Sequence, residues 1–216
     1  MTQKIPCFCD NSFTVEIPQE IDLDSEPKFL DEILNGTFLN FTCPSCGKKH
    51  KPEFAMKILW PSKKVMFDVF VELDRGEFYR RKKEKDSPGP LSRETIIGYP
   101  ELADRLLVYR DGFDPVAVEA IKYYLYLKAE ENYPDEEIDI WYSCRNPADL
   151  SLPAESLEFH LHGIKKDEVA VMRIPYSLYE KTLDDYKKHP KNEVFTALKH
   201  RSYLSVKNTM RPEALK

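Results

Sequence analysis

The sequence predicts an α+β fold in which a β-rich N-terminal module with one short helix is followed by a mixed region of helices and antiparallel strands. Segments with alternating apolar and polar residues are interspersed with segments of helical periodicity. The two kinds do not alternate in the regular strand–helix–strand order of a parallel sheet, which favours the α+β class. With 216 residues, 42% hydrophobic and 32% charged, the chain can form one elongated domain or two small ones.

The N-terminal elements are short. Residues 12–17, "SFTVEI", alternate and predict a strand. Residues 25–36, "SEPKFLDEILNG", predict a helix with Ser25 as its cap and Gly36 as its stop. Further strands are predicted over residues 37–42, 53–60 and 64–73, the last two forming a hairpin that turns at Pro61.

A charged, proline-containing segment, residues 79–90, predicts a linker or a long exposed loop. Helices follow over residues 100–112 and 114–131, and Asp114 caps the second of them with Pro115 at its first position. Three further strands are predicted at residues 138–144, 156–163 and 168–174, and two closing helices at residues 176–188 and 192–204.

Four cysteines form two close pairs. Cys7 and Cys9 in "IPCFCD" are one residue apart, and Cys43 and Cys46 in "CPSCG" have the two-residue spacing of a metal-binding knuckle. A zinc ion takes about four thiolate ligands in a tetrahedron, at roughly 2.3 Å. The intervening strand and helix can bring Cys43 back towards Cys7. The sequence therefore predicts one structural zinc ion bound by these four cysteines.

Alternative interpretations of the cysteines remain. The spacing of Cys43 and Cys46 is also that of a thiol oxidoreductase, although Gly47 and Pro52 oppose the helix that usually activates the first thiol. His50 could replace one cysteine as a ligand. Cys144 is interpreted as a small core residue, because no base for a nucleophile is evident.

No catalytic motif accompanies these residues, so whether the chain is an enzyme stays uncertain. His160 and His162 alternate on a predicted strand and therefore share one face, which is interpreted as solvated. A net charge of -5 does not favour nucleic acid as a partner of the whole chain. A basic run leaves that alternative open, and it comprises Arg80, Arg81, Lys82 and Lys83.

The chain is expected to be cytoplasmic. Its first residues lack the apolar segment of a signal peptide, and no apolar run has the length of a membrane span. In a reducing compartment, clustered cysteines are more often metal ligands or redox groups than disulfides. With no reaction indicated, the predicted role is a binding or scaffolding module for a protein partner.

Several motifs together resemble the CpXC family, an uncharacterised family of bacteria and archaea. The matching stretches are "IPCFC", "EIPQEID", "LNGTFLNFTCPSCGKKH", "MKILWPSKKVMFDVFVEL" and "ELADRLLVYRDGFDPVAVEAIKYYL". The resemblance implies a zinc-ribbon-like module on Cys7, Cys9, Cys43 and Cys46, and no known activity. The one-residue spacing of Cys7 and Cys9 departs from the family's C-P-x-C pattern.

The resemblance also suggests a domain organisation. Residues 1–130 form the CpXC-like domain, with the zinc-ribbon-like module at about 1–78, a loop at 79–92 and a helical half at 93–130. Residues 131–205 supply the C-terminal strands and closing helices, and 206–216 form a tail.

Overall fold

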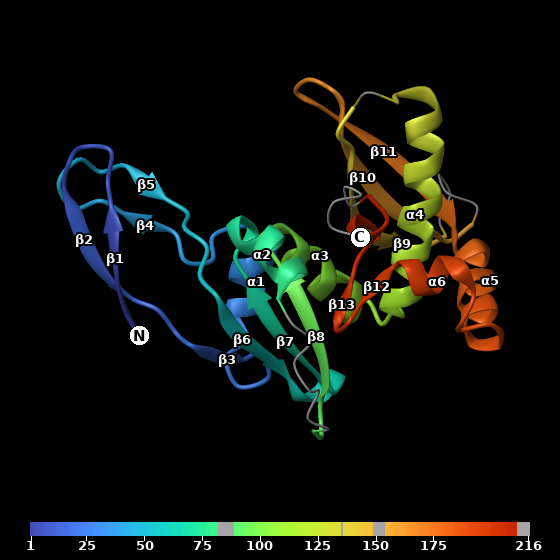
Figure 1. Ribbon diagram of the computed structural model, residues 1–216, viewed down its shortest axis with the longest axis horizontal. Helices are drawn as coiled ribbons and strands as arrows, with labels where there is room; N and C mark the ends of the chain where they lie inside the picture. Colours follow the sequence, from blue (N-terminus) through green and yellow to red (C-terminus); the bar gives the residue numbers. More distant parts are fainter. Residues whose placement is uncertain (82–88, 135, 149–153, 211–216) are drawn as a thin grey trace. The chain divides into compact units, whose positions relative to one another are not determined.

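The computed structural model describes residues 1–81, 89–134, 136–148 and 154–210, and it confirms the α+β class (Figure 1). The chain forms two compact units, Met1–Ala103 and Asp104–Lys216. The boundary near residue 130 that the sequence suggests stays a prediction. Among the described helices, none combines the length and the apolar character needed to cross a bilayer.

Two small hairpins carry the cysteines in the first unit. β1 (Thr2–Pro6) and β2 (Ser12–Glu16) pair antiparallel, and so do β4 (Phe41–Thr42) and β5 (Lys49–His50). The strand predicted over residues 37–42 is thus reduced to its last two residues, because Phe38 and Leu39 form a turn. β1 was not anticipated from the sequence.

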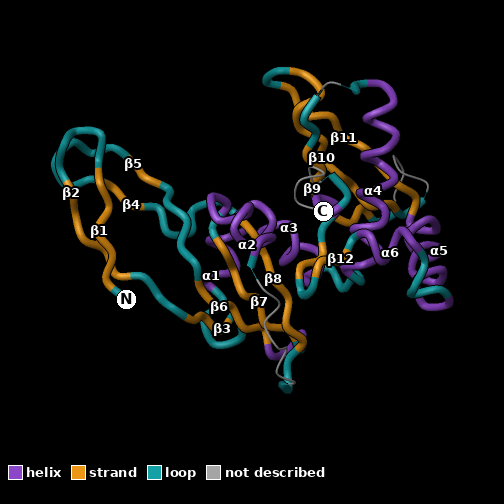
Figure 2. The backbone as a smooth tube through the Cα atoms, in the orientation of Figure 1, coloured by secondary structure: helices purple, strands orange, loops and turns teal. Residues whose placement is uncertain are grey.

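The first unit also contains a mixed sheet (Figure 2). Within the first unit, its strands run in the order β8 (Ser92–Ile97), β7 (Val65–Phe70), β6 (Met56–Trp60) and β3 (Glu20–Asp22). The predicted hairpin of β6 and β7 is antiparallel and turns through a 3-10 helix at Pro61–Lys63, whereas β7–β8 and β3–β6 are parallel. Ile58, Val65 and Phe67 are completely buried, so this sheet has a core of its own.

The helices of the first unit differ in detail from the predictions. α1 (Lys28–Leu34) ends before Gly36, as expected, but Ser25 does not cap it, because the Ser25 hydroxyl donates to the carbonyl of Asp22 instead. α2 (Arg75–Arg80) extends into the segment predicted as a loop and buries Tyr79. α3 (Tyr99–Arg110) follows β8, and the boundary between the two units falls within it, after Ala103.

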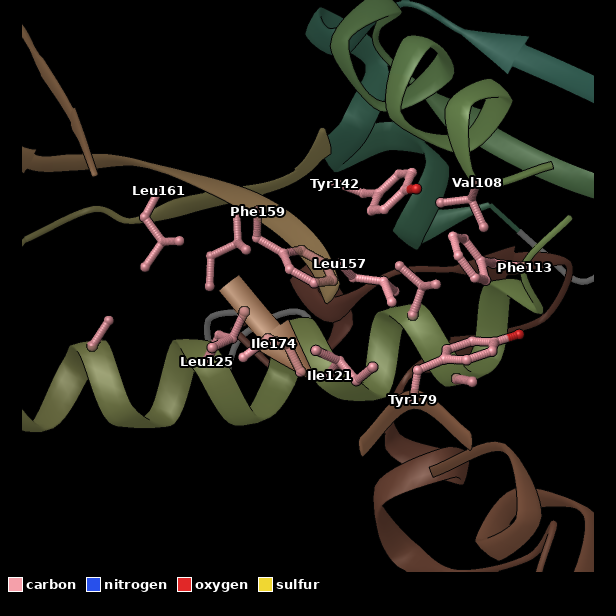
Figure 3. Packing of buried hydrophobic residues seen from close by; sticks show 14 of the residues in the cluster. Val108, Phe113, Ile121, Leu125, Tyr142, Leu157, Phe159, Leu161, Ile174 and Tyr179 are labelled. Carbon is pink, nitrogen blue, oxygen red and sulfur yellow. The ribbon is translucent and has the colours of Figure 1, made fainter. Parts of the chain in front are cut away.

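The second unit packs a long helix against an antiparallel sheet. α4 (Pro115–Asn132) begins at the predicted cap, where Asp114 accepts hydrogen bonds from two backbone N–H groups. The sheet order is β11 (Glu168–Pro175), β10 (Ser156–Lys165) and β9 (Asp139–Asn146). Figure 3 shows the core between them, where Ile121 and Leu125 of α4 face Leu157, Phe159 and Leu161 of β10.

The closing segment forms more elements than the two predicted helices. α5 (Tyr176–Lys188) agrees with its prediction. The helix predicted over residues 192–204 ends early, as α6 (Glu193–Ala197), and is followed by β12 (Lys199–His200), β13 (Tyr203–Leu204) and a 3-10 helix at Val206–Asn208. Arg201 has a φ of 59°, so the chain turns between β12 and β13 and cannot continue as a helix.

Candidate metal centre

The four predicted cysteines meet at one point. All four Sγ atoms lie within 4.8 Å of one another. The Sγ atoms of Cys7 and Cys46 are 3.5 Å apart, and those of Cys9 and Cys43 are 3.8 Å apart. A tetrahedral zinc ion with zinc–sulfur bonds of about 2.3 Å separates its sulfurs by about 3.8 Å. The cluster therefore has the dimensions of a tetrahedral tetrathiolate site.

The first pair is presented by a turn after β1. The N–H of Asp10 donates to the carbonyl of Cys7 (3.1 Å), and the N–H of Cys7 donates to the carbonyl of Asn11 (2.8 Å). Asp10 has a φ of 62°, which reverses the chain. Because Cys7 and Cys9 lie in this turn rather than in an extended strand, a one-residue spacing suffices to direct both sulfurs inwards. Phe8, between them, is 88% exposed.

The second pair occupies the turn between β4 and β5. The N–H of Gly47 donates to the carbonyl of Cys43, and the N–H of Cys43 to the carbonyl of Lys48, both at 2.9 Å. Gly47 has a φ of 72°, a conformation that costs glycine little. The side chains of Asn11 and Ser45 are hydrogen-bonded and join the two turns.

His50 lies beside the cluster rather than in it. Its Nε2 is 3.2 Å from the sulfur of Cys7. The His50 ring stacks on Phe8, with 6.2 Å between centroids, and meets Phe13 edge-on. Partners of this kind orient metal ligands and tune their basicity. The geometry thus assigns His50 a supporting position.

The thiols of the cluster differ in acidity without a metal. Burial raises the pKa of Cys43, but the N–H groups of Cys46 and Ser45 outweigh it and lower that pKa to about 7. The N–H of Cys9 acts to lower the pKa of Cys7, yet burial and the neighbouring thiols raise it to about 12. Of these two thiols, Cys43 loses its proton more easily. A bound cation would have to displace the proton of Cys7.

The other candidate residues lie apart from this centre. Among the residues that the structure describes, the four cysteines form the one potential metal-binding group. His160 contacts Glu158 at 3.3 Å, His162 is exposed, and Cys144 donates to Asn146. In the basic run, Arg81 pairs with Glu77, whereas Lys82 and Lys83 lie outside the described residues.

Comparison with known protein families matches residues 5–122 to the family described as "CpXC protein". The chain belongs to the CpXC protein family. The matched region covers more than half of the chain, contains all four clustered cysteines and ends within α4.

An uncharacterized protein of Treponema pallidum (strain Nichols) is 28% identical over 217 residues, which cover 95% of this chain and 97% of that protein. No solved structure matches the chain. This CpXC protein therefore has a cysteine cluster compatible with metal binding, and its relative carries no assigned activity.

The sequence did not anticipate the hydrogen bond between Asn11 and Ser45 or the stacking of Phe8 on His50. A signal was nevertheless present. Phe8 lies between the two cysteines of the first pair, and Asn11 lies two residues after Cys9. His50 is the first residue after the lysines that follow Cys46, at the point where β5 runs back past the cluster.

Proposed function

We propose that this CpXC protein is a cytoplasmic binding or scaffolding protein whose N-terminal module is held together by one structural zinc ion. The observation that supports it is the convergence of four thiols from two hairpins within 4.8 Å of one another. Four thiolate ligands favour zinc over harder cations such as Mg²⁺ or Ca²⁺. They also leave no open position for water or substrate, which is the arrangement of a structural site.

The geometry of the cysteines supports a thiol oxidoreductase less well than it supports a structural zinc site. A reactive C-x-x-C thiol is activated by the N-terminus of a helix. Here Cys46 is followed by Gly47 and then β5, so no helix begins at the pair. The Sγ of Cys46 also lies 3.5 Å from that of Cys7, which belongs to the other hairpin. Titration of all the thiols with and without a chelator separates the two functions, since a redox dithiol reacts equally in both.

Substitution of the ligands tests the site. Cys43→Ser and Cys46→Ser should each remove tight zinc binding, because three thiolates and a hydroxyl bind far more weakly than four thiolates. Cys144→Ser is the matched control, since Cys144 lies on β9 outside the cluster, and its zinc content should equal that of the wild type. Zinc retained by both cluster variants, or lost in the control, would show that the ligands are others.

The pH dependence of zinc affinity follows from the two shifted thiols. At pH 7, Cys7 is protonated, because its pKa is near 12. Cys43 is about half protonated, because its pKa is near 7. Binding therefore releases at least about 1.5 protons from these two, so affinity should rise at least about thirtyfold between pH 6.5 and 7.5. Competition with a chromophoric chelator at several pH values measures it. A flat profile would contradict this protonation pattern.

His50→Ala should weaken zinc binding without abolishing it. The loss of one supporting partner of a ligand typically costs about 10–100-fold in metal affinity. His162→Ala is the control, because His162 is exposed on β10. If His50→Ala removed zinc altogether, His50 would belong to the ligand set, and if it changed nothing, its contact with Cys7 would be incidental.

The proposed binding role draws on Phe8. This side chain is 88% exposed at the tip of the cysteine turn, and the ammonium of Lys48 lies 5.3 Å from its ring centroid. Exposed aromatic residues on a rigid support are common anchors at protein interfaces. Affinity purification of wild type and Phe8→Ser, each with full zinc content, tests it. Identical sets of partners would rule out Phe8 as the contact.

A further inference from the structure

β11 is an edge strand that the second unit leaves open. It pairs with β10 on one side, and within the described part of the chain no backbone hydrogen bond reaches its other side. At the opposite edge of the same sheet, the N–H of Tyr142 in β9 donates to the carboxylate of Asp104 (2.6 Å). Proteins usually protect open edges with charges, prolines or bulges. β11 instead carries four consecutive apolar residues, Val169 to Met172.

An exposed apolar surface surrounds this edge. Val169 and Val171 are 47% and 54% exposed. A groove of about 330 Å³ runs between β11 and the end of α4, and Lys128 and Asn132 contribute to its wall. Tyr124 is 53% exposed and lies one helical turn before Lys128, on the same side of α4. Within the described residues of the second unit, the valines of β11 and Tyr124 on this side of α4 are thus left exposed.

We propose that β11 pairs antiparallel with β11 of a second copy of this chain. A two-fold axis that pairs a strand with itself runs through one residue position, because residues opposite each other lie on the same face of the sheet. Centring the pair on Ala170 places Val169 opposite Val171 of the second copy. The same register places Arg173 beside Asp167 of the second copy, and symmetry repeats both contacts.

Neighbouring registers lose this complementarity. Centring on Val171 would place Val169 opposite Arg173 of the second copy. Centring on Val169 would place Val171 beside Asp167 of the second copy and would move Arg173 beyond the end of the paired β11 strands. The sequence of the hairpin is thus self-complementary in one register, with valines at the centre and opposite charges at both ends. That property is required of a symmetric interface and is not needed for pairing with an unrelated strand.

Arg173 is already positioned for this contact. Its Nε is 3.0 Å from a carboxylate oxygen of Glu158, and its side chain is 53% exposed. A guanidinium has five N–H donors, so the bond to Glu158 fixes its direction and leaves donors for a second carboxylate. Asp167 is exposed in the turn before β11 and has a φ of 59°. The proposed ion pairs would therefore lie at the two ends of the paired strands.

Sedimentation equilibrium of the full zinc-loaded chain tests the proposal. The wild type should be a dimer at micromolar concentration, and Val171→Lys should be a monomer. Leu73→Lys is the matched control, because Leu73 is 97% exposed in the first unit, and it should remain dimeric. A monomeric wild type at 100 micromolar would overturn the proposal, as would a Val171→Lys variant that dimerises like the wild type. If β11 instead pairs with a strand of another protein, the purified wild-type chain should sediment as a monomer.

A charge exchange tests the register. Asp167→Arg and Arg173→Asp should each raise the dimer dissociation constant about tenfold, because each replaces two attractive cross-strand pairs by repulsive ones. The double variant restores opposite charges and should recover most of the wild-type affinity. Zinc content and circular dichroism confirm that each variant is folded. A double variant as weak as the single ones would overturn this register, and this test does not depend on whether the metal is zinc.

Discussion

Removing the metal should unfold the two cysteine hairpins and leave the second unit folded. β1 and β2 have five residues each, and β4 and β5 only two. Isolated hairpins are marginal in water. A structural zinc ion contributes about 10–16 kcal/mol of apparent binding free energy at neutral pH, which exceeds the ~5–15 kcal/mol net stability of a typical domain. The metal should therefore decide whether this segment is ordered.

Hydrogen exchange with and without a strong chelator measures this effect. Amides of residues 2–16 and 41–50 should lose protection to within about tenfold of an unstructured chain, because local opening then costs little free energy. β10 should keep its protection, since Leu157, Phe159 and Leu161 are buried against α4. Within the first unit, β7 is the internal control, because Val65 and Phe67 are completely buried. Protection around Cys43 that survives loss of the metal would contradict a structural role.

Lys122→Met should destabilise the second unit by about 3–5 kcal/mol. The Lys122 ammonium is buried and contacts Asp104 (2.5 Å) and Glu119 (2.8 Å). Burial acts to lower the pKa of Lys122, but these two carboxylates outweigh it and raise that pKa. The guanidinium of Arg105 lies 3.4 Å from the carboxylate of Glu119 and supplies the second positive charge for these two carboxylates. Removing the ammonium leaves two buried carboxylates with one cation.

Calorimetry of the full chain measures this change. The midpoint temperature of unfolding of the second unit should fall by about 10 °C or more. The matched control is Lys188→Met. Lys188 pairs with Asp184, and both side chains are more than half exposed, so its loss should cost less than about 1 kcal/mol. If the two variants were equally stable, the buried network would contribute no more than a surface ion pair.

Local patterns in the sequence predicted much of this structure. The cysteine spacings identified the cluster, because two short turns are enough to place each pair of sulfurs. Asp114 and Pro115 marked the beginning of α4 correctly, since a cap acts on the next few residues. The alternation of β9, β10 and β11 also predicted strands, because one face of each packs against α4.

The unpredicted features depend on contacts between distant residues. β8 pairs in parallel with β7, although "SRETII" follows a charged segment and has little alternation. Parallel pairing across a long connection leaves no turn signal to detect. The buried ions of α4 were missed too, although Glu119 and Lys122 interrupt the apolar stretch "VAVEAIKYY". Charges three residues apart on an otherwise apolar helix were the available signal of an internal ion pair.

Mass spectrometry of the purified chain, under native and then denaturing conditions, tests the structural-zinc account most directly. The native mass should exceed the denatured mass by one zinc ion per chain, corrected for the protons that the thiols release. Cys144→Ser should show the same difference, and Cys43→Ser should show none. A wild-type chain produced in zinc-replete medium whose native and denatured masses are equal would contradict the account.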